Sequence, residues 1–228
     1  SYPKITDIFI QNSVGIVTAR DKLTIKWTKD AVWTTVLNFS KLDPENARTV
    51  YKLGKDVRDW KVEFAQKDLK DSGLDLGKIV PILYRPFDIR YTYYTGKSRG
   101  FLCMPRPEVM RHMLKDNIGL LTCRQQSMVG FYHAFVCNSI LESCVVSNKT
   151  SEINYVFLLY LYPVTNSPEK QSSVRNLMLF ESKADYGTRK PNLSSAIIEQ
   201  LTKNYKKSPS PEQIFFYIYA ILYSNIYR

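Results

Sequence analysis

The spacing of apolar side chains is helical through much of the first third of the chain. The pattern predicts three helices there: one that begins near Asp30, one capped by Asp43 with Pro44 in its first turn, and one from about Asp59 to Leu69. This third of the chain is therefore predicted to be mainly helical.

The residues ahead of these helices show no helical spacing. We expect residues 1–22 to be irregular, with an exposed loop at Ser13–Asp21. Leu23–Trp27 alternates between apolar and polar side chains, which predicts a short strand.

From Ile79 onward the apolar spacing changes to that of strands. Thr95–Gly100 is typical of a hairpin loop, and a helix is predicted to open at Pro107 and to run through Leu114. The predicted strands are Ile79–Tyr84, Ile89–Tyr94, Phe101–Met104, Ile118–Cys123, Phe131–Cys137, Tyr155–Tyr162 and Leu177–Phe180.

Two helices are predicted to close the chain after a polar loop at residues 163–192. The second has a clear start signal, because Ser210 can cap it, Pro211 suits its first position and Gln213 has the spacing of a capping box. Its body, Ile214–Leu222, is apolar nearly all round, so we expect it to be buried.

The order of these elements predicts an α+β fold. Helices come first, then strands, then helices again, which argues against alternating β-α-β units. We expect a mixed, mostly antiparallel sheet with flanking helices. Three segments are predicted: a helical N-terminal segment at 1–78, a strand-rich core at 79–192, and C-terminal helices at 193–228 that pack on the core.

The chain carries a large excess of positive charge, with 32 Lys and Arg against 21 Asp and Glu and a formal net charge of +11. Such an excess favours a polyanionic partner, although ribosomal and membrane-surface proteins share it. Half of the arginines lie between Tyr84 and Gln126, interleaved with aromatic side chains. Because a guanidinium can bind a phosphate or a guanine edge with two hydrogen bonds, this stretch favours contact with DNA.

Several other kinds of chemistry leave no signature in the chain. The nine glycines form no phosphate-binding loop, and His112 and His133 lack metal-ligand spacing with the cysteines. We interpret the four scattered cysteines as reduced thiols: Cys103, Cys123, Cys137 and Cys144.

The chain shows no signal peptide and no apolar run of bilayer length, so a cytoplasmic protein without a membrane partner is predicted. It begins without Met and stops directly after an apolar segment, so we expect it to be a piece of a longer protein.

One pattern imitates a nuclease site. Pro168-Glu169 and, after an apolar run, Glu181-Ser182-Lys183 have the order in which two carboxylates hold Mg²⁺ and a lysine orients water. A polar loop followed by the end of a surface strand explains the same residues, and we favour that interpretation.

Several motifs, in order along nearly the whole chain, resemble the C-terminal part of type ISP restriction–modification enzymes. The segments that carry the resemblance are Gly15–Asp21, Tyr84–Tyr91, Arg106–Leu114, Arg124–Gln126, Leu159–Pro163, Pro191–Leu193 and Ser210–Leu222. The resemblance implies a target-recognition domain that binds double-stranded DNA.

The same resemblance implies a larger parent chain. It would add a nuclease, an ATP-driven translocase, a coupling segment and an N6-adenine methyltransferase, with the methyltransferase and coupling domains as intramolecular partners. The parent would use S-adenosylmethionine, ATP and Mg²⁺, whereas this part would need no cofactor and would not be an enzyme.

Recognition would combine base contacts with phosphate contacts. The residues expected to read bases are Lys97 and Arg99 at the hairpin tip and Arg124, Gln125, Gln126 and Ser127 after a strand. The residues expected to contact the DNA backbone are Thr18, Arg20, Arg90, Arg106, Arg111 and His112.

Some of these assignments have equal alternatives. Arg85 and Arg90 flank Asp88 and could form internal ion pairs, and Arg106 and Arg111 could lie on a solvated helix face. A different function, a structural or coupling module that packs on neighbouring domains, remains the alternative to DNA recognition.

Overall fold

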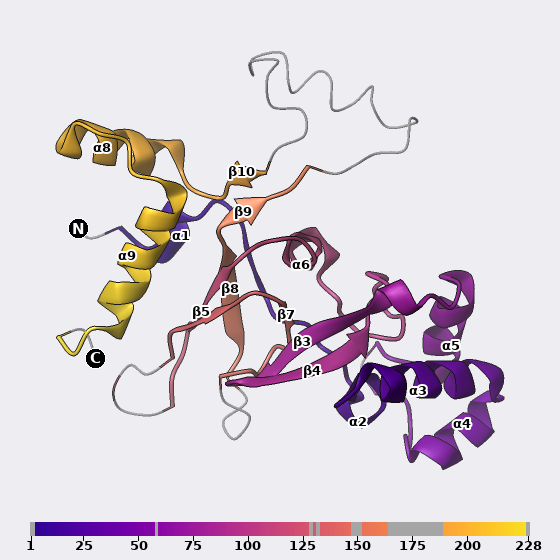
Figure 1. Cartoon of the computed structure of the whole chain (residues 1–228). Helices are drawn as coiled ribbons and strands as arrows, with labels where there is room; N and C mark the ends of the chain where they lie inside the picture. Colours follow the sequence, from indigo (N-terminus) through magenta and orange to yellow (C-terminus); the bar gives the residue numbers. More distant parts are fainter. Residues whose placement is uncertain are drawn as a thin grey trace.

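The computed structural model describes residues 3–57, 59–127, 130, 133–146, 152–163 and 189–226. Figure 1 shows strands in the middle of the molecule, helices α3, α4 and α5 at one end, and helices α8 and α9 at the other. The predicted α+β fold with a mixed, mostly antiparallel arrangement of strands is confirmed.

The first sheet is built on a long β-hairpin. Its strands, in the order β2-β4-β3-β7, are β2 (Ile25–Lys26), β4 (Asp88–Tyr93), β3 (Ile79–Arg85) and β7 (Ile140–Leu141). β3 and β4, which match the strands predicted at Ile79–Tyr84 and Ile89–Tyr94, pair antiparallel around a turn at Pro86–Phe87, and β7 runs parallel to β3. We call this the hairpin sheet.

The second sheet is antiparallel throughout. Its strands, in the order β1-β8-β5-β6, are β1 (Asn12–Val14), β8 (Asn154–Leu158), β5 (Gly119–Cys123) and β6 (Phe135–Cys137). A separate pair joins β9 (Tyr160–Leu161) to β10 (Lys190–Pro191). We call the four-stranded sheet the meander sheet.

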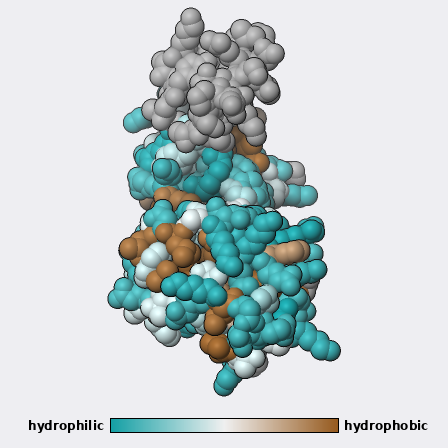
Figure 2. Space-filling view, turned by 90° about the vertical axis from the view of Figure 1, so that its right-hand side faces the viewer, coloured by the Kyte–Doolittle hydropathy of each residue, from teal (hydrophilic) through white to brown (hydrophobic). Residues whose placement is uncertain are grey.

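The predicted N-terminal helices are confirmed with small shifts. They are α3 (Lys29–Lys41), α4 (Pro44–Tyr51) and α5 (Val62–Asp71), preceded by the short α1 (Ile5–Ile8) and α2 (Asp21–Thr24) and followed by the 3₁₀ turn η1 (Leu76–Lys78). Asp43 caps α4 by accepting a hydrogen bond from the Asn46 amide. The side of the molecule that carries these helices is largely hydrophilic, with separate hydrophobic patches (Figure 2).

Residues 13–21 do not form the exposed loop that was expected. β1 pairs with β8, and the following residues enter the core, where Ile16 and Thr18 are buried. The Ile16 amide donates to the Leu141 carbonyl, and the Ile16 carbonyl accepts from the Ser143 amide. The segment therefore connects the two sheets by backbone hydrogen bonds. The backbones approach so closely at Gly15 that a Cβ there would overlap the backbone of Glu142.

Several predicted strands are shorter, divided or absent. Only Ile25–Lys26 of the expected strand at Leu23–Trp27 is extended, because α2 takes up Leu23 and Thr24. Phe101–Met104 is buried without forming a named strand, and only Met104 makes a bridge, to Val17. The expected strand at Leu177–Phe180 lies outside the described residues.

The remaining helices are α6 (Pro107–Met113), α8 (Ser195–Tyr205) and α9 (Pro211–Tyr223). The capping box at the start of α9 is confirmed, since Ser210 and Gln213 exchange hydrogen bonds. The expected burial of α9 is wrong, because Ile214 and Phe215 are its only fully buried side chains. The helix packs on the meander sheet through one side only and leaves several large apolar side chains exposed: Phe216, Tyr217, Ile221 and Tyr223.

The segment boundaries at 78/79 and 192/193 stay a prediction. β1 and β2 belong to the first predicted segment but are hydrogen-bonded into sheets of the second. Within the described residues none of the four cysteines forms a disulfide, and Cys103 and Cys137 are buried. In the described part of the chain no helix is both long and apolar enough to cross a bilayer.

A buried carboxylate holds the loop after β4. Asp68 of α5 accepts hydrogen bonds from the Phe101 amide and the Thr95 hydroxyl, both at 2.8 Å. Gly100 leaves space for this carboxylate, since a Cβ there would overlap it. Because the Phe101 amide is buried, losing its acceptor would leave a donor unsatisfied.

We therefore expect Asp68→Ala to lower the free energy of unfolding by about 2–3 kcal/mol. Asp71→Ala, at a half-exposed carboxylate on the same helix, is the control and should change it by less than about 0.5 kcal/mol. Urea denaturation of the three proteins measures both values. Equal losses in the two variants would contradict this role of Asp68.

Candidate nucleic-acid interface

The two loops predicted to read bases lie at opposite ends of the hairpin sheet. The Lys97–Arg99 loop follows the end of β4, whereas the turn at Pro86–Phe87 precedes its start. The segment after β5 lies beside that turn, because Phe135, which pairs with Leu121 of β5, packs against the Phe87 ring at 6.2 Å. A six-residue strand spans about 20 Å, so the loops are not brought together.

We call the end with the turn the loop edge: the turn at residues 86–87, the segment 124–127 and Glu152 just before β8 (Figure 1). Two buried side chains hold its central segment. The His133 Nδ1 lies 3.1 Å from the Gln126 Oε1, and its Nε2 lies 3.2 Å from a carboxylate oxygen of Glu152. Glu152 also accepts a hydrogen bond from the backbone amide of Ser127. The segment 124–127 is therefore anchored through the side chain of Gln126 and the backbone of Ser127.

Arg124 and Gln125 precede this anchored stem and are exposed. Among the residues that the structure describes, no hydrogen bond or ion pair engages the Arg124 guanidinium. A rigid backbone with an uncommitted guanidinium can form the paired hydrogen bonds that a guanine edge or a phosphate accepts. Gln126 is used differently, since it supports His133.

The arginines near the hairpin turn have internal partners. Arg90 forms a two-pronged ion pair with Asp88, with nitrogen–oxygen distances between 2.8 and 3.1 Å, and its guanidinium stacks on the rings of Trp27 and Tyr84. Arg85 pairs with the buried Glu142 at 2.8 Å. Of the two alternatives left open by the sequence, the structure thus shows internal ion pairs for both arginines.

Lys97 and Arg99 form only loose pairs at the surface. Lys97 lies 3.2 Å from Asp71, and Arg99 lies 3.6 Å from Asp59, with all four side chains at least half exposed. Such pairs contribute little and exchange easily, so both cations remain free to meet an anion.

Two expected backbone contacts near the N-terminus have structural partners. The buried Thr18 hydroxyl donates to Asp21, just inside α2. Arg20 donates to the Lys55 carbonyl and lies 5.3 Å above the Trp60 ring. The burial of Thr18 does not support a phosphate contact, whereas Arg20 is partly exposed and is held by its contacts with Lys55 and Trp60.

The two arginines at α6 differ in how far they are engaged within the fold. Arg111 donates to the Tyr162 carbonyl at 3.0 Å, and burial lowers its pKa. Arg106 adopts a left-handed backbone conformation just before the helix, and its guanidinium lies 3.4 Å from the Met104 sulfur. Arg106 is partly exposed and therefore remains a candidate for a phosphate.

His112 is 1% exposed and serves the core. Its Nδ1 accepts a hydrogen bond from the Tyr162 amide at 2.8 Å. This bond requires the neutral imidazole and would be lost if Nδ1 were protonated. Burial, and secondly the charge of Arg111, lowers the pKa of His112 to about 4. The expected contact of His112 with DNA is not supported, since its ring is enclosed.

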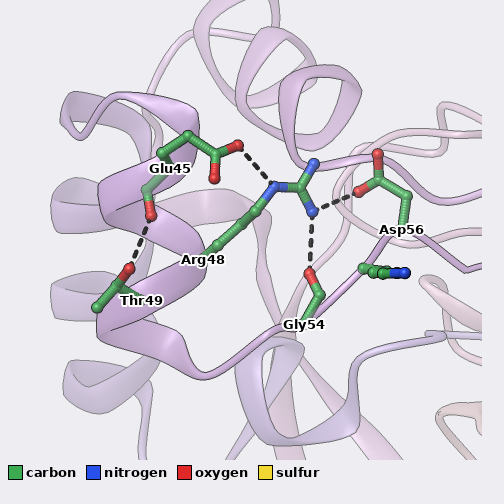
Figure 3. A pocket seen from close by; sticks show the side chains of 6 residues that line it. Glu45, Arg48, Thr49, Gly54 and Asp56 are labelled. Carbon is green, nitrogen blue, oxygen red and sulfur yellow. Dashed lines mark hydrogen bonds and ion pairs between the residues drawn. The ribbon is translucent and has the colours of Figure 1, made fainter.

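A shallow hollow of about 520 Å³ lies beside α4. Figure 3 shows Arg48 reaching between Glu45 and Asp56, at 3.1 and 2.8 Å, with a further hydrogen bond to the Gly54 carbonyl. The hydrogen bond to Asp56 raises the pKa of Arg48 and lowers that of Asp56. These groups satisfy one another and secure the end of α4, so we assign the hollow no binding role.

A larger groove of about 1310 Å³ lies between α1, α8, α9 and the meander sheet. Its walls are mostly apolar, with Phe157 and Tyr155 from the sheet and Ile214 and Ile218 from α9, and Arg124 lies at its rim. In the described part of the chain no three His, Cys, Asp or Glu side chains are placed to hold a metal ion. The nuclease-like residues Glu169, Glu181 and Lys183 lie outside the described residues.

Sequence reasoning did not find Glu152 or Phe87. Glu152 stands far from Gln126 in the chain, and no local spacing links them. Phe87 lies in the Tyr84–Tyr91 motif but was not singled out there, and the structure leaves it exposed. Exposure in a turn depends on what surrounds it, so no sequence signal reveals it.

The sequence pattern of the Type ISP C-terminal specificity domain family matches residues 7–228. No curated protein sequence matches the chain. Similar solved structures include a cryo-EM structure of a DrdV–DNA complex, with 18% identity, a TM-score of 0.60 and 94% of this chain covered.

Two more similar structures are Type ISP restriction–modification enzymes. One is a nuclease-deletion mutant of LlaGI in complex with a DNA substrate mimic, with 17% identity, a TM-score of 0.58 and 99% coverage of this chain. The other is the ATP-dependent enzyme LlaBIII bound to DNA, with 13% identity, a TM-score of 0.61 and 95% coverage. This chain spans 19%, 19% and 13% of the chains of DrdV, LlaGI and LlaBIII, so the likeness concerns the fold of one part of each.

The lowered pKa of His112 predicts a loss of stability in acid. The unfolded chain binds a proton at this side chain below about pH 6.5, whereas the folded chain resists it to about pH 4, so stability falls as the pH drops through that window. His112→Asn retains an acceptor for the Tyr162 amide and removes the titration. Between pH 7 and pH 4.5 we expect the wild-type protein to lose about 2–3 kcal/mol more than the variant, measured by urea unfolding.

The variant starts from a lower free energy of unfolding because its smaller side chain leaves a cavity. The quantity compared is therefore the change in unfolding free energy with pH in each protein. Carboxylates titrate in both proteins and cancel. Parallel stability curves in the two proteins would refute this account of His112.

Proposed function

Since this chain belongs to the Type ISP C-terminal specificity domain family, we propose that it recognises a particular sequence in double-stranded DNA. The observation that carries the proposal is the anchored segment at the loop edge, which presents the uncommitted Arg124 guanidinium beside the exposed Gln125. The similar structures of DrdV, LlaGI and LlaBIII, each in complex with DNA or a DNA mimic, support the same assignment.

Base reading is assigned to the loop edge. Arg124 suits the two acceptors of a guanine in the major groove, and Gln125 suits the acceptor and donor of an adenine. Gln126, Ser127 and Glu152 keep the segment in place, because the Gln126 side-chain oxygen contacts His133 and the Ser127 backbone amide donates to Glu152. Preorganisation of this kind means that binding does not have to order the loop.

Phosphate contacts are assigned to cations elsewhere. Lys97 and Arg99 follow the other end of β4, and a six-residue strand spans about 20 Å, so we do not expect them to read base pairs next to that of Arg124. Because they are exposed and loosely paired, they suit the DNA backbone, as does Arg106. These contacts would set the position of the duplex while Arg124 and Gln125 supply discrimination.

The parent chain is also part of the proposal. We infer an enzyme that joins an N6-adenine methyltransferase to an ATP-dependent nuclease and translocase, with S-adenosylmethionine, ATP and Mg²⁺ as its cofactors. In such a chain the methyltransferase would bind one side of the DNA duplex and this domain the other. The domain itself would contribute recognition and no chemistry.

A second candidate function has one specific observation in its favour. The exposed apolar side chains of α9 and the groove beside it suit a module that packs on neighbouring domains. That function requires no sequence preference in DNA binding. It is compatible with weak, salt-sensitive binding through the positive charge of the chain.

Selection from a random duplex library tests the proposal. We expect the protein to enrich one motif of fixed length, and Arg124→Ala to lose about 1–3 kcal/mol of discrimination at a single base position. Arg99→Ala should instead weaken binding to all duplexes alike and make the dependence of affinity on salt shallower. Sequencing of retained DNA and fluorescence anisotropy at several salt concentrations measure these effects.

If Arg124→Ala weakened all sequences equally, Arg124 would be a phosphate contact and not a base reader. If the wild-type protein retained DNA without any motif, the second candidate function would replace the first.

A further inference from the structure

The turn of the hairpin sheet presents an aromatic ring to solvent. Phe87 is 92% exposed, and its backbone has φ = 63°. Bulky side chains seldom adopt a positive φ, since the conformation is sterically costly and persists only where the surroundings impose it. A ring that is both exposed and held in this conformation is not explained by packing within the chain.

The surroundings of the turn impose its shape. On one side Asp88 and Arg90 form their two-pronged ion pair, with Arg90 sandwiched between the Trp27 and Tyr84 rings. On the other side Arg85 pairs with the buried Glu142. The tip is therefore rigid, and each charge next to it is matched by an opposite charge.

A small apolar patch continues from this ring toward the recognition segment. Phe135 touches the Phe87 ring edge-on, and Ile89 and Val136, which are close in the sequence to these two rings, are exposed. Phe135 pairs with Leu121, three residues before Arg124 in the chain. The apolar tip and the free guanidinium thus belong to the same edge of the molecule.

We propose that Phe87 is an apolar wedge, whose ring opens a base step next to the position read by Arg124 and stacks on one of its bases. Rigid apolar side chains are the kind that insert between base pairs, and stacking tolerates any base because each has a flat aromatic face. This inference rests on the proposed function, and it adds a DNA contact that carries no charge and no hydrogen bond.

A wedge favours steps that open easily. Pyrimidine–purine steps are the most readily unstacked, so the recognised sequence is expected to carry one where Phe87 enters, even without a hydrogen bond to it. A protein partner suits this tip less well than DNA does, because the larger exposed apolar surface of the chain lies on α9.

The test uses duplexes that carry the motif selected by the wild-type protein, with the fluorescent base 2-aminopurine at successive positions. Binding of the wild-type protein should raise the fluorescence at one step, because unstacking relieves quenching. Phe87→Asn removes the ring but suits the positive φ, so the turn should keep its shape. We expect this variant to lose the fluorescence rise, to bind roughly tenfold more weakly and to select the pyrimidine–purine step less strongly.

Phe87→Trp should retain the fluorescence rise, since it keeps an aromatic ring. Phe64→Ala on α5 is the matched control, because it removes an exposed ring from another part of the molecule and should change none of these values.

The proposal is overturned if the wild-type protein binds its motif while Phe87→Asn matches it in affinity, in selected sequence and in fluorescence. A loss of thermal stability or of contact with a neighbouring domain, with DNA binding intact, also overturns it and assigns the ring to a protein interface. Failure of the proposed function is distinguishable, because then the wild-type protein selects no motif at all.

Discussion

The fold depends on the passage of residues 12–18 between its two sheets. β1 extends the meander sheet, and within two residues Ile16 is hydrogen-bonded to Leu141 and Ser143, at the end of the hairpin sheet. The approach is so close that Gly15 cannot carry a side chain there. Backbone hydrogen bonds on both sides satisfy the buried amides, which would otherwise carry a large desolvation cost. This crossing fixes one sheet against the other.

That relation between the sheets creates the loop edge. The turn at residues 86–87 belongs to the hairpin sheet, whereas the segment 124–127 and Glu152 belong to the meander sheet. A shift between the sheets would separate Phe87 from Phe135 and leave the two candidate DNA contacts on unrelated surfaces. The architecture thus has a functional consequence, since recognition groups need fixed relative positions in order to discriminate.

The many basic residues divide into two classes by their partners. Arg85, Arg90 and Arg48 each pair with a carboxylate, and Arg85 and Arg90 also lie over aromatic rings, so all three stabilise the fold. Arg124 has no such partner in the described part of the chain, and Lys97 has only an exposed one. Net charge attracts DNA at long range and says nothing of which cations touch it. The candidate DNA contacts are therefore the few basic side chains among the described residues that lack an internal partner or have only an exposed one.

The sequence by itself determined the local elements. Caps such as Asp43 and Ser210, the helix start at Pro107 and the strands of the β3–β4 hairpin follow from interactions between residues a few positions apart, which a pattern records. Family motifs likewise identified the chain before its fold was known. These features depend only on residues close together in the chain, so the local sequence is sufficient to predict them.

Only the tertiary structure decided which side chains are covered. Residues 13–18 were expected to form an exposed loop, yet they lie between the two sheets with Ile16 and Thr18 buried, whereas the strongly apolar α9 packs through one side only. His112 is buried against a partner 50 residues away in the chain, and Arg90 is engaged by Asp88, Trp27 and Tyr84, whereas Arg124 remains exposed. Burial and partnership depend on contacts between distant parts of the chain, and no local spacing encodes them.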